Sequence, residues 1–167
     1  MNRPLRRYTI YTLFLAFLII FQSLNVYSHV SIKRVSPDFL LVGIACISFF
    51  LGPLPGEVIG FIIGIVVDII SGGLLGISAF LYTILGFGFG TIGEKVFESY
   101  LFISVLTLFM ATLVKALILA MLAIVFLKPG YFGFFKNGRI FLEAVFNGTV
   151  APLFFFLVSK IERKYAG

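Results

Sequence analysis

The sequence has few of the residues on which soluble domains and many catalytic sites depend. Only 12% of its 167 residues are charged, and it has one cysteine, Cys46, and one histidine, His29. Because a soluble domain carries about 25% charged residues, the scarcity of charge argues against one. A lone cysteine forms neither an intrachain disulfide nor a thiolate metal cluster. A lone histidine excludes a metal site built from several histidines, and its place in a short polar segment argues against a catalytic triad.

What the chain has in abundance is apolar side chains. Hydrophobic residues make up 60% of the sequence, and 22 residues are phenylalanine. This composition predicts a protein embedded in the lipid bilayer. The net charge of +6 is small, and most basic residues lie beside hydrophobic runs, so we expect no binding of nucleic acid. The glycine-rich run 86–90 lacks the strand-turn-helix context of a phosphate or dinucleotide loop, and we expect no cofactor and no metal.

Six apolar runs predict an all-α membrane protein with about six transmembrane helices in a single integral membrane domain, 1–167. A helix needs about 20 residues to cross a hydrocarbon core about 30 Å thick. The runs are approximately 8–27, 38–51, 57–70, 75–92, 100–127 and 140–159. The second and third are short and are separated by the run Gly52-Pro53-Leu54-Pro55-Gly56, which predicts a tight helix-breaking turn. This 38–70 hairpin either spans fully or re-enters, and five helices is the main alternative.

Basic residues near the ends of the runs predict the orientation. We expect an uncleaved first helix rather than a secretory signal. Cytoplasmic ends of spans carry an excess of Lys and Arg, and both termini are basic, with Arg3, Arg6 and Arg7 at the start and Lys160, Arg163 and Lys164 at the end. We therefore expect a multi-pass protein of the bacterial cytoplasmic (inner) membrane with both termini in the cytoplasm.

Glycines recur at helical spacing in the third and fourth runs. Gly56, Gly60 and Gly64 are four residues apart, and Gly86 and Gly90 repeat that interval. Residues four apart lie on nearly the same helix face, and small residues on one face let membrane helices approach closely. We expect these five glycines to mediate helix packing.

Two aspartates, one at the start of the second apolar run and one inside the third, have two interpretations each. Asp68 continues the glycine stripe; it is either a polar anchor for a partner or ligand, or a cap for the turn that follows. Asp38 follows Ser36 and Pro37, a pattern typical of a helix start with serine as N-cap and a carboxylate in the first turn. We favour capping for Asp38 but keep both residues as candidates for partner binding or a polar network.

Lys115 lies near the middle of the fifth apolar run. A lysine at that depth normally faces the interior of a bundle and has an acceptor. The candidate acceptors are Glu143 and Asn147, four residues apart on the sixth helix, and Asp68. We interpret Lys115 as part of a structural interhelical pair, with proton or ligand handling as the alternative.

Several short motifs resemble one known family. They are Pro37-Asp38-Phe39-Leu40-Leu41, Gly52-Pro53, Gly60-Phe61 with Gly64 and Asp68, Leu75-Gly76, and Leu81-Tyr82-Thr83. At this spacing, and with the length and hydropathy of nearly the whole chain, the sequence resembles the MreD family of rod shape-determining integral membrane proteins. The motifs themselves lie between residues 37 and 83.

The resemblance implies a scaffold of the bacterial cell-elongation machinery that is not an enzyme. It implies MreC, a bitopic protein, as first partner and a role in peptidoglycan synthesis during lateral wall growth. RodA with its class B penicillin-binding protein, and the actin-like MreB, are further expected partners, direct or indirect. The implied architecture is similar to the S-component fold of energy-coupling-factor transporters.

Two other functions remain as alternatives. The first is a substrate-binding S-component of a vitamin transporter, although the alanine-x-x-x-alanine docking signature is not visible in the first run, where Ala16 stands alone. The second is an enzyme of lipid chemistry. It would need ionisable groups clustered in one pocket, and Asp68, Lys115 and Glu143 are far apart in sequence.

Overall fold

The computed structural model describes residues 3–23, 37–72, 74–95, 100–125 and 138–165. Within them the chain forms six helices and confirms the predicted all-α fold. The helices are α1 (Arg3–Ser23), α2 (Phe39–Leu51), α3 (Pro53–Ser71), α4 (Ile77–Lys95), α5 (Tyr100–Val125) and α6 (Arg139–Tyr165).

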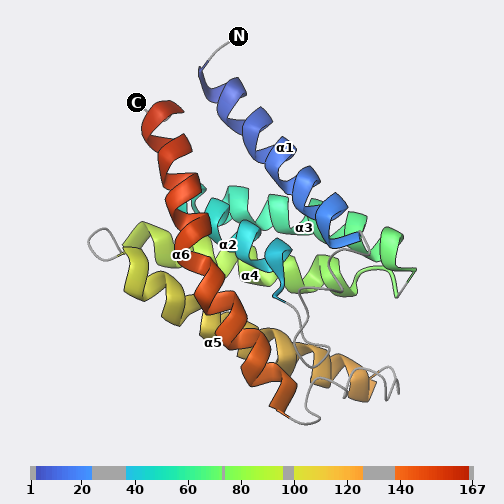
Figure 1. The fold of residues 1–167 in the computed structure, drawn as a ribbon. Coiled ribbons are helices and arrows are strands. Elements are labelled where there is room, and N and C mark those ends of the chain that lie inside the picture. Colours follow the sequence, from blue (N-terminus) through green and yellow to red (C-terminus); the bar gives the residue numbers. More distant parts are fainter. Residues whose placement is uncertain (1–2, 24–36, 73, 96–99, 126–137, 166–167) are drawn as a thin grey trace.

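Helix α2 forms the centre of the bundle. Every residue from Leu40 to Phe49 is buried, because α1, α3, α4 and α6 all pack against this helix. In Figure 1, α3 and α4 lie side by side, while α1 and α6 run across them. Helix α5 packs mainly on α6, and the amino and carboxy termini lie at the same end of the bundle (Figure 1). A short apolar helix is therefore enclosed by longer ones.

The break between α2 and α3 is a single residue, so the prediction of a five-residue turn was wrong. Gly52 has a φ of 93°, and Pro53 already begins α3. Proline is accepted there because the first N–H groups of a helix have no intrahelical partner. Pro55 lies in the same first turn, so neither proline interrupts the helix. Helix α1 likewise begins earlier than expected, and the predicted residues 24–27 lie outside the described part of the chain.

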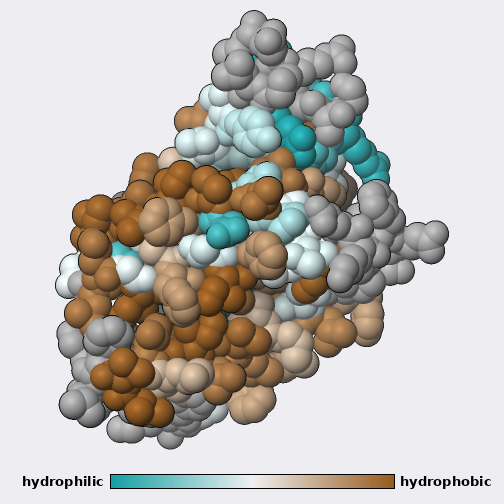
Figure 2. Space-filling view, turned by 180° about the vertical axis from the view of Figure 1, so that it is seen from behind, coloured by the Kyte–Doolittle hydropathy of each residue, from teal (hydrophilic) through white to brown (hydrophobic). Residues whose placement is uncertain are grey.

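Among the described residues, three helices are long and apolar enough to cross a membrane, judged by length and composition. They are α3, the segment Val105–Leu122 of α5, and Arg139–Lys164 of α6. Helix α2 and Ile77–Gly93 of α4 are shorter apolar helices. Figure 2 shows an apolar surface over most of the described part of one face, with many of its hydrophilic residues gathered toward the end that carries the termini. This surface is the one expected of a membrane bundle.

Glycines form the contact between α3 and α4. A Cβ atom added at Gly60 would collide with the backbone of Tyr82, and one added at Gly64 would collide with Ala79. Gly56 and Gly86 face each other in the same way, each against the other's carbonyl oxygen. At Gly90, a Cβ would meet the backbone of Gly52. The two backbones therefore touch along the stripe of small residues.

Candidate functional site

Lys115 lies between two carboxylates in the interior of the bundle. Its Nζ atom is 2.6 Å from Oδ2 of Asp38 and 2.7 Å from Oε1 of Glu143. The three side chains are 8–12% exposed. They come from α5, from the start of α2 and from α6, so one ammonium group connects three helices that are far apart in sequence. We call Asp38, Lys115 and Glu143 the ionic cluster.

Asp38 is held in the cluster by its position at the start of α2. It is the N-cap of that helix, and its Oδ1 atom accepts a hydrogen bond from the backbone N–H of Leu41 at 3.0 Å. The expected assignment of Ser36 as N-cap and Pro37 as first helical residue was wrong, because the helix begins at Phe39. The cap leaves Oδ2 for Lys115, and the same carboxylate accepts from the hydroxyl of Tyr82 at 3.3 Å. Asp38 is thus both cap and ion-pair partner.

Asn147 joins the cluster through the backbone of Asp38 rather than through Lys115. Its Oδ1 atom accepts from the N–H of Asp38 at 2.7 Å, and its Nδ2 donates to Oγ1 of Thr112 at 2.9 Å. Asn147 and Glu143 lie one turn apart on α6, as their spacing predicts, and each reaches a different part of the same cluster. A fully buried amide therefore has a partner on both of its ends, as buried polar groups require.

Asp68 lies outside the ionic cluster. Its carboxylate accepts hydrogen bonds from the backbone N–H groups of Gly76 at 2.8 Å, Ser78 at 3.0 Å and Ala79 at 3.3 Å. These are groups at the start of α4, which the intrahelical ladder leaves without partners. Asp68, at the end of α3, therefore caps the next helix, and it is only 4% exposed. The geometry matches the capping interpretation. Asp68 is not the acceptor of Lys115, whose ion-pair partners are Asp38 and Glu143.

The ionic cluster can fix the relative positions of helices. One ammonium faces two carboxylates, and Tyr82, Asn147 and the α2 cap take up further hydrogen-bonding capacity. A buried ion pair adds little net stability compared with apolar packing, but removing one partner is costly. The arrangement therefore penalises any shift of α5 or α6 against α2. In the described residues, no group of three His, Cys, Asp or Glu side chains is placed to hold a metal ion.

Sequence reasoning did not find a second ion pair, between α1 and α6. Arg7 contacts Oε1 of Glu162 at 2.8 Å, and the hydroxyl of Tyr11 donates to the same oxygen. Glu162 is 8% exposed. The sequence does show charged residues at the start of the first apolar run and at the end of the last one. This pattern predicts an ion pair between them only when the two helices are known to be neighbours.

One open cleft is lined by neither the ionic cluster nor the Arg7–Glu162 pair. It has a volume of about 320 Å³ and is lined by Leu74, Leu75, Gly76, Ile77, Phe80 and Leu122. Its walls are apolar, and the ionic cluster does not line it. An enzyme of lipid chemistry would need its ionisable groups in one pocket. The structure brings Lys115 and Glu143 together but leaves Asp68 elsewhere, and none of the three lines this cleft.

These features define a polytopic helical membrane bundle whose buried charges are used to hold helices together. The sequence matches the family described as rod shape-determining protein MreD over residues 3–161. The chain belongs to the MreD family, whose members are inner-membrane proteins of the MreBCD cell-shape machinery. Comparison with curated proteins and with solved structures gives no match. The likeness to S-components stays a prediction.

Proposed function

We propose that this protein is a non-enzymatic membrane scaffold of the cell-elongation machinery, which binds MreC and supports peptidoglycan synthesis during lateral wall growth. The observation that carries the proposal is the family match over residues 3–161. The ionic cluster supports it, because its charged groups are paired with one another across α2, α5 and α6. A bundle fixed in this way presents constant helix faces to a partner.

The proposed binding surface is the exposed face of α3 near Asp68. Asp38 and Asp68 are themselves buried, so neither presents its charge to a partner. Ile69 and Ile70 follow Asp68 and are 64% and 55% exposed. A bitopic partner such as MreC has one membrane-spanning helix, and helices in a membrane associate through van der Waals packing of their faces. RodA with its class B penicillin-binding protein, and MreB, would join through MreC or directly.

In the proposed orientation both termini are cytoplasmic. They lie at one end of the bundle (Figure 1), and the last turn of α6 contains Arg163 and Lys164. This agrees with the excess of basic residues at cytoplasmic ends.

Purification of the tagged chain from native membranes, followed by mass spectrometry of bound proteins and small molecules, tests the proposal. We expect MreC to be recovered with the wild-type chain, and recovery to fall at least threefold when Ile69 and Ile70 are both changed to alanine. The matched control is Val58→Ala with Phe61→Ala, two exposed residues in the first half of α3. Equal recovery with both variants would contradict the proposed surface. Recovery of a vitamin-like molecule and a transport module in place of MreC would favour an S-component.

A further inference from the structure

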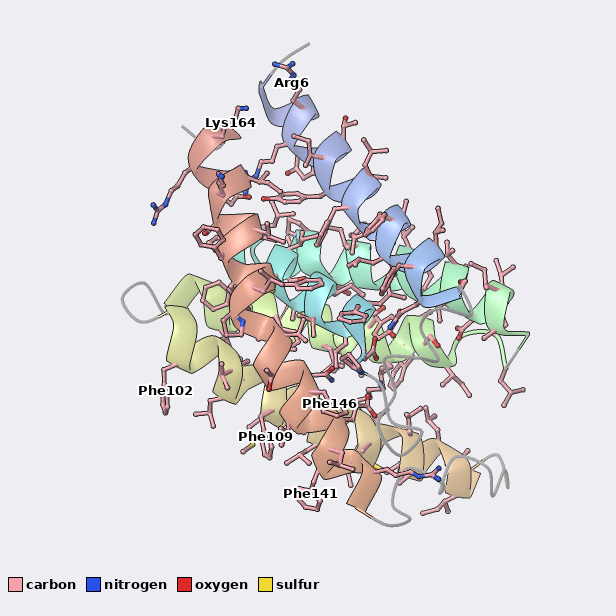
Figure 3. The ribbon with its side chains drawn as sticks, viewed as in Figure 1. Arg6, Phe102, Phe109, Phe141, Phe146 and Lys164 are labelled. Atoms are coloured by element: carbon pink, nitrogen blue, oxygen red, sulfur yellow. The ribbon has the colours of Figure 1, made fainter. Side chains whose placement is uncertain are left out.

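The ends of α1 and α6 are joined at the end of the bundle that carries the termini. Arg7 of α1 pairs with Glu162 of α6, and Tyr11 donates to the same carboxylate. Figure 3 shows Arg6 of α1 and Lys164 of α6 at this end, whereas the labelled phenylalanines of α5 and α6 lie away from it. Side chains from opposite ends of the sequence therefore contribute to one surface.

This surface is strongly basic. Residues 6–11 and 160–164 contain five basic side chains and one acidic side chain, a net charge of +4. The single acid, Glu162, is buried against Arg7 and Tyr11. The exposed charges around the pair are all positive, and they belong to Arg6, Lys160, Arg163 and Lys164.

Helix dipoles explain only part of this charge. Arg163 and Lys164 lie in the last turn of α6, where cations are favoured by the partial negative charge of the helix end. Arg6 lies near the start of α1, where the dipole disfavours a cation. Arg7 is compensated by Glu162. The helix dipole therefore does not account for Arg6, and negative charge outside the protein would stabilise it.

Apolar side chains lie next to the basic ones along both helices. Tyr8 on α1 is 49% exposed, and Phe156 and Leu157 on α6 are 61% and 41% exposed. A tyrosine beside basic residues, bordered by apolar groups, is typical of the level at which lipid headgroups meet the acyl chains. Long basic side chains at that level extend their charges toward the headgroups.

We propose that the joined ends of α1 and α6 form a binding surface for anionic phospholipid headgroups. Arg6 from α1 and Lys160, Arg163 and Lys164 from α6 contact the phosphates, and the Arg7–Glu162 pair keeps the two helix ends together so that their charges act on the same lipids. The surface is separate from the α3 face proposed for MreC, so the two proposals stand or fall independently.

The test uses the full chain in bilayers of phosphatidylcholine that contain a minor fraction of phosphatidylglycerol. After extraction in a neutral detergent, mass spectrometry measures the ratio of the two lipids that stay bound. We expect phosphatidylglycerol to be enriched severalfold over the bilayer ratio, and the enrichment to decrease as sodium chloride is added. Basic residues near an anionic membrane surface are attracted to its headgroups. Changing all four exposed basic residues to glutamine should therefore return the bound ratio to that of the bilayer.

The matched control is Arg139→Gln, which removes one positive charge at the opposite end of α6. This variant should keep the wild-type enrichment. All four substituted positions are exposed, so the fourfold variant is expected to fold, and its elution in size-exclusion chromatography checks this. The proposal is overturned if the wild-type chain shows no preference for phosphatidylglycerol, if the folded fourfold variant keeps the preference, or if Arg139→Gln removes it.

Discussion

Lys115 shows most clearly how single residues determine the interior of this protein. A lysine within an apolar helix needs an acceptor, and the structure supplies two, Asp38 and Glu143. One positive charge therefore faces two negative charges, so the ammonium also reduces the repulsion between the two carboxylates. Removing the lysine and removing one carboxylate should have unequal effects, because only the first leaves two buried carboxylates without a cation.

We expect Lys115→Met to lower the free energy of unfolding by about 3–5 kcal/mol, the usual effect of breaking a buried ion pair from one side. Glu143→Gln should cost about 1 kcal/mol, since the Lys115–Asp38 pair remains and an amide can still accept the hydrogen bond. Denaturant titration of the purified chain in mixed micelles measures both values. Equal losses, or a smaller loss for Lys115→Met, would contradict the unequal roles assigned to the lysine and the carboxylate.

The sequence predicted part of this cluster. Lys115 and Glu143 were recognisable because a charge inside an apolar run has few explanations. Asp38 was not assigned to Lys115, because its position at a helix start already explains a carboxylate through local capping, and the structure uses it for both purposes. Asp68 illustrates the reverse case: it follows a helix-packing stripe, but its three backbone partners all belong to the next helix start.

At the scale of the helices, glycine position decides how closely α3 and α4 pack. Gly86 and Gly88 stand two residues apart on α4 and have opposite environments. A Cβ at Gly86 would collide with the carbonyl of Gly56, whereas a Cβ at Gly88 would meet nothing within 4 Å. The four-residue spacing accounts for this difference, since Gly86 belongs to the stripe and Gly88 does not.

This pair gives a direct test of the packing. Gly86→Ala should destabilise the protein by about 1–3 kcal/mol, because the two backbones must separate to accept the methyl group. Gly88→Ala should be neutral or should stabilise the helix by up to about 1 kcal/mol, since alanine is the better helix former. Thermal unfolding of the two variants under identical conditions compares them. A loss at Gly88 as large as the loss at Gly86 would contradict the role assigned to the stripe.

Helix ends were harder to predict than helix existence. Apolar runs located all six helices, because burial and membrane contact both require them. The start of α3 was misplaced because two prolines usually indicate a break, while both prolines here fall in a first turn that does not need their N–H groups. The sequence did not predict that α2 is the enclosed helix. Its burial results from contacts with helices that are distant in sequence, and a local sequence pattern does not reveal such contacts.

At the scale of the whole molecule, the charges that remain exposed and those that are buried have separate roles. The ionic cluster and the Asp68 cap act inside the described bundle, whereas the basic residues at the ends of α1 and α6 face outward. The chain belongs to the MreD family, and the proposed scaffold would meet its partners through exposed helix faces such as that of α3. Such a scaffold needs a rigid interior, and the cluster would supply it.

The central claim is that this bundle binds MreC directly, and reconstitution tests it most directly. The purified chain and purified full-length MreC, each carrying a fluorescent label, are reconstituted into one lipid bilayer, and complex formation is measured by single-molecule colocalisation within it. We predict saturable complex formation by the wild-type chain and by Val58→Ala/Phe61→Ala, and at least threefold weaker formation by Ile69→Ala/Ile70→Ala. Absence of any complex between the two wild-type proteins would contradict the account.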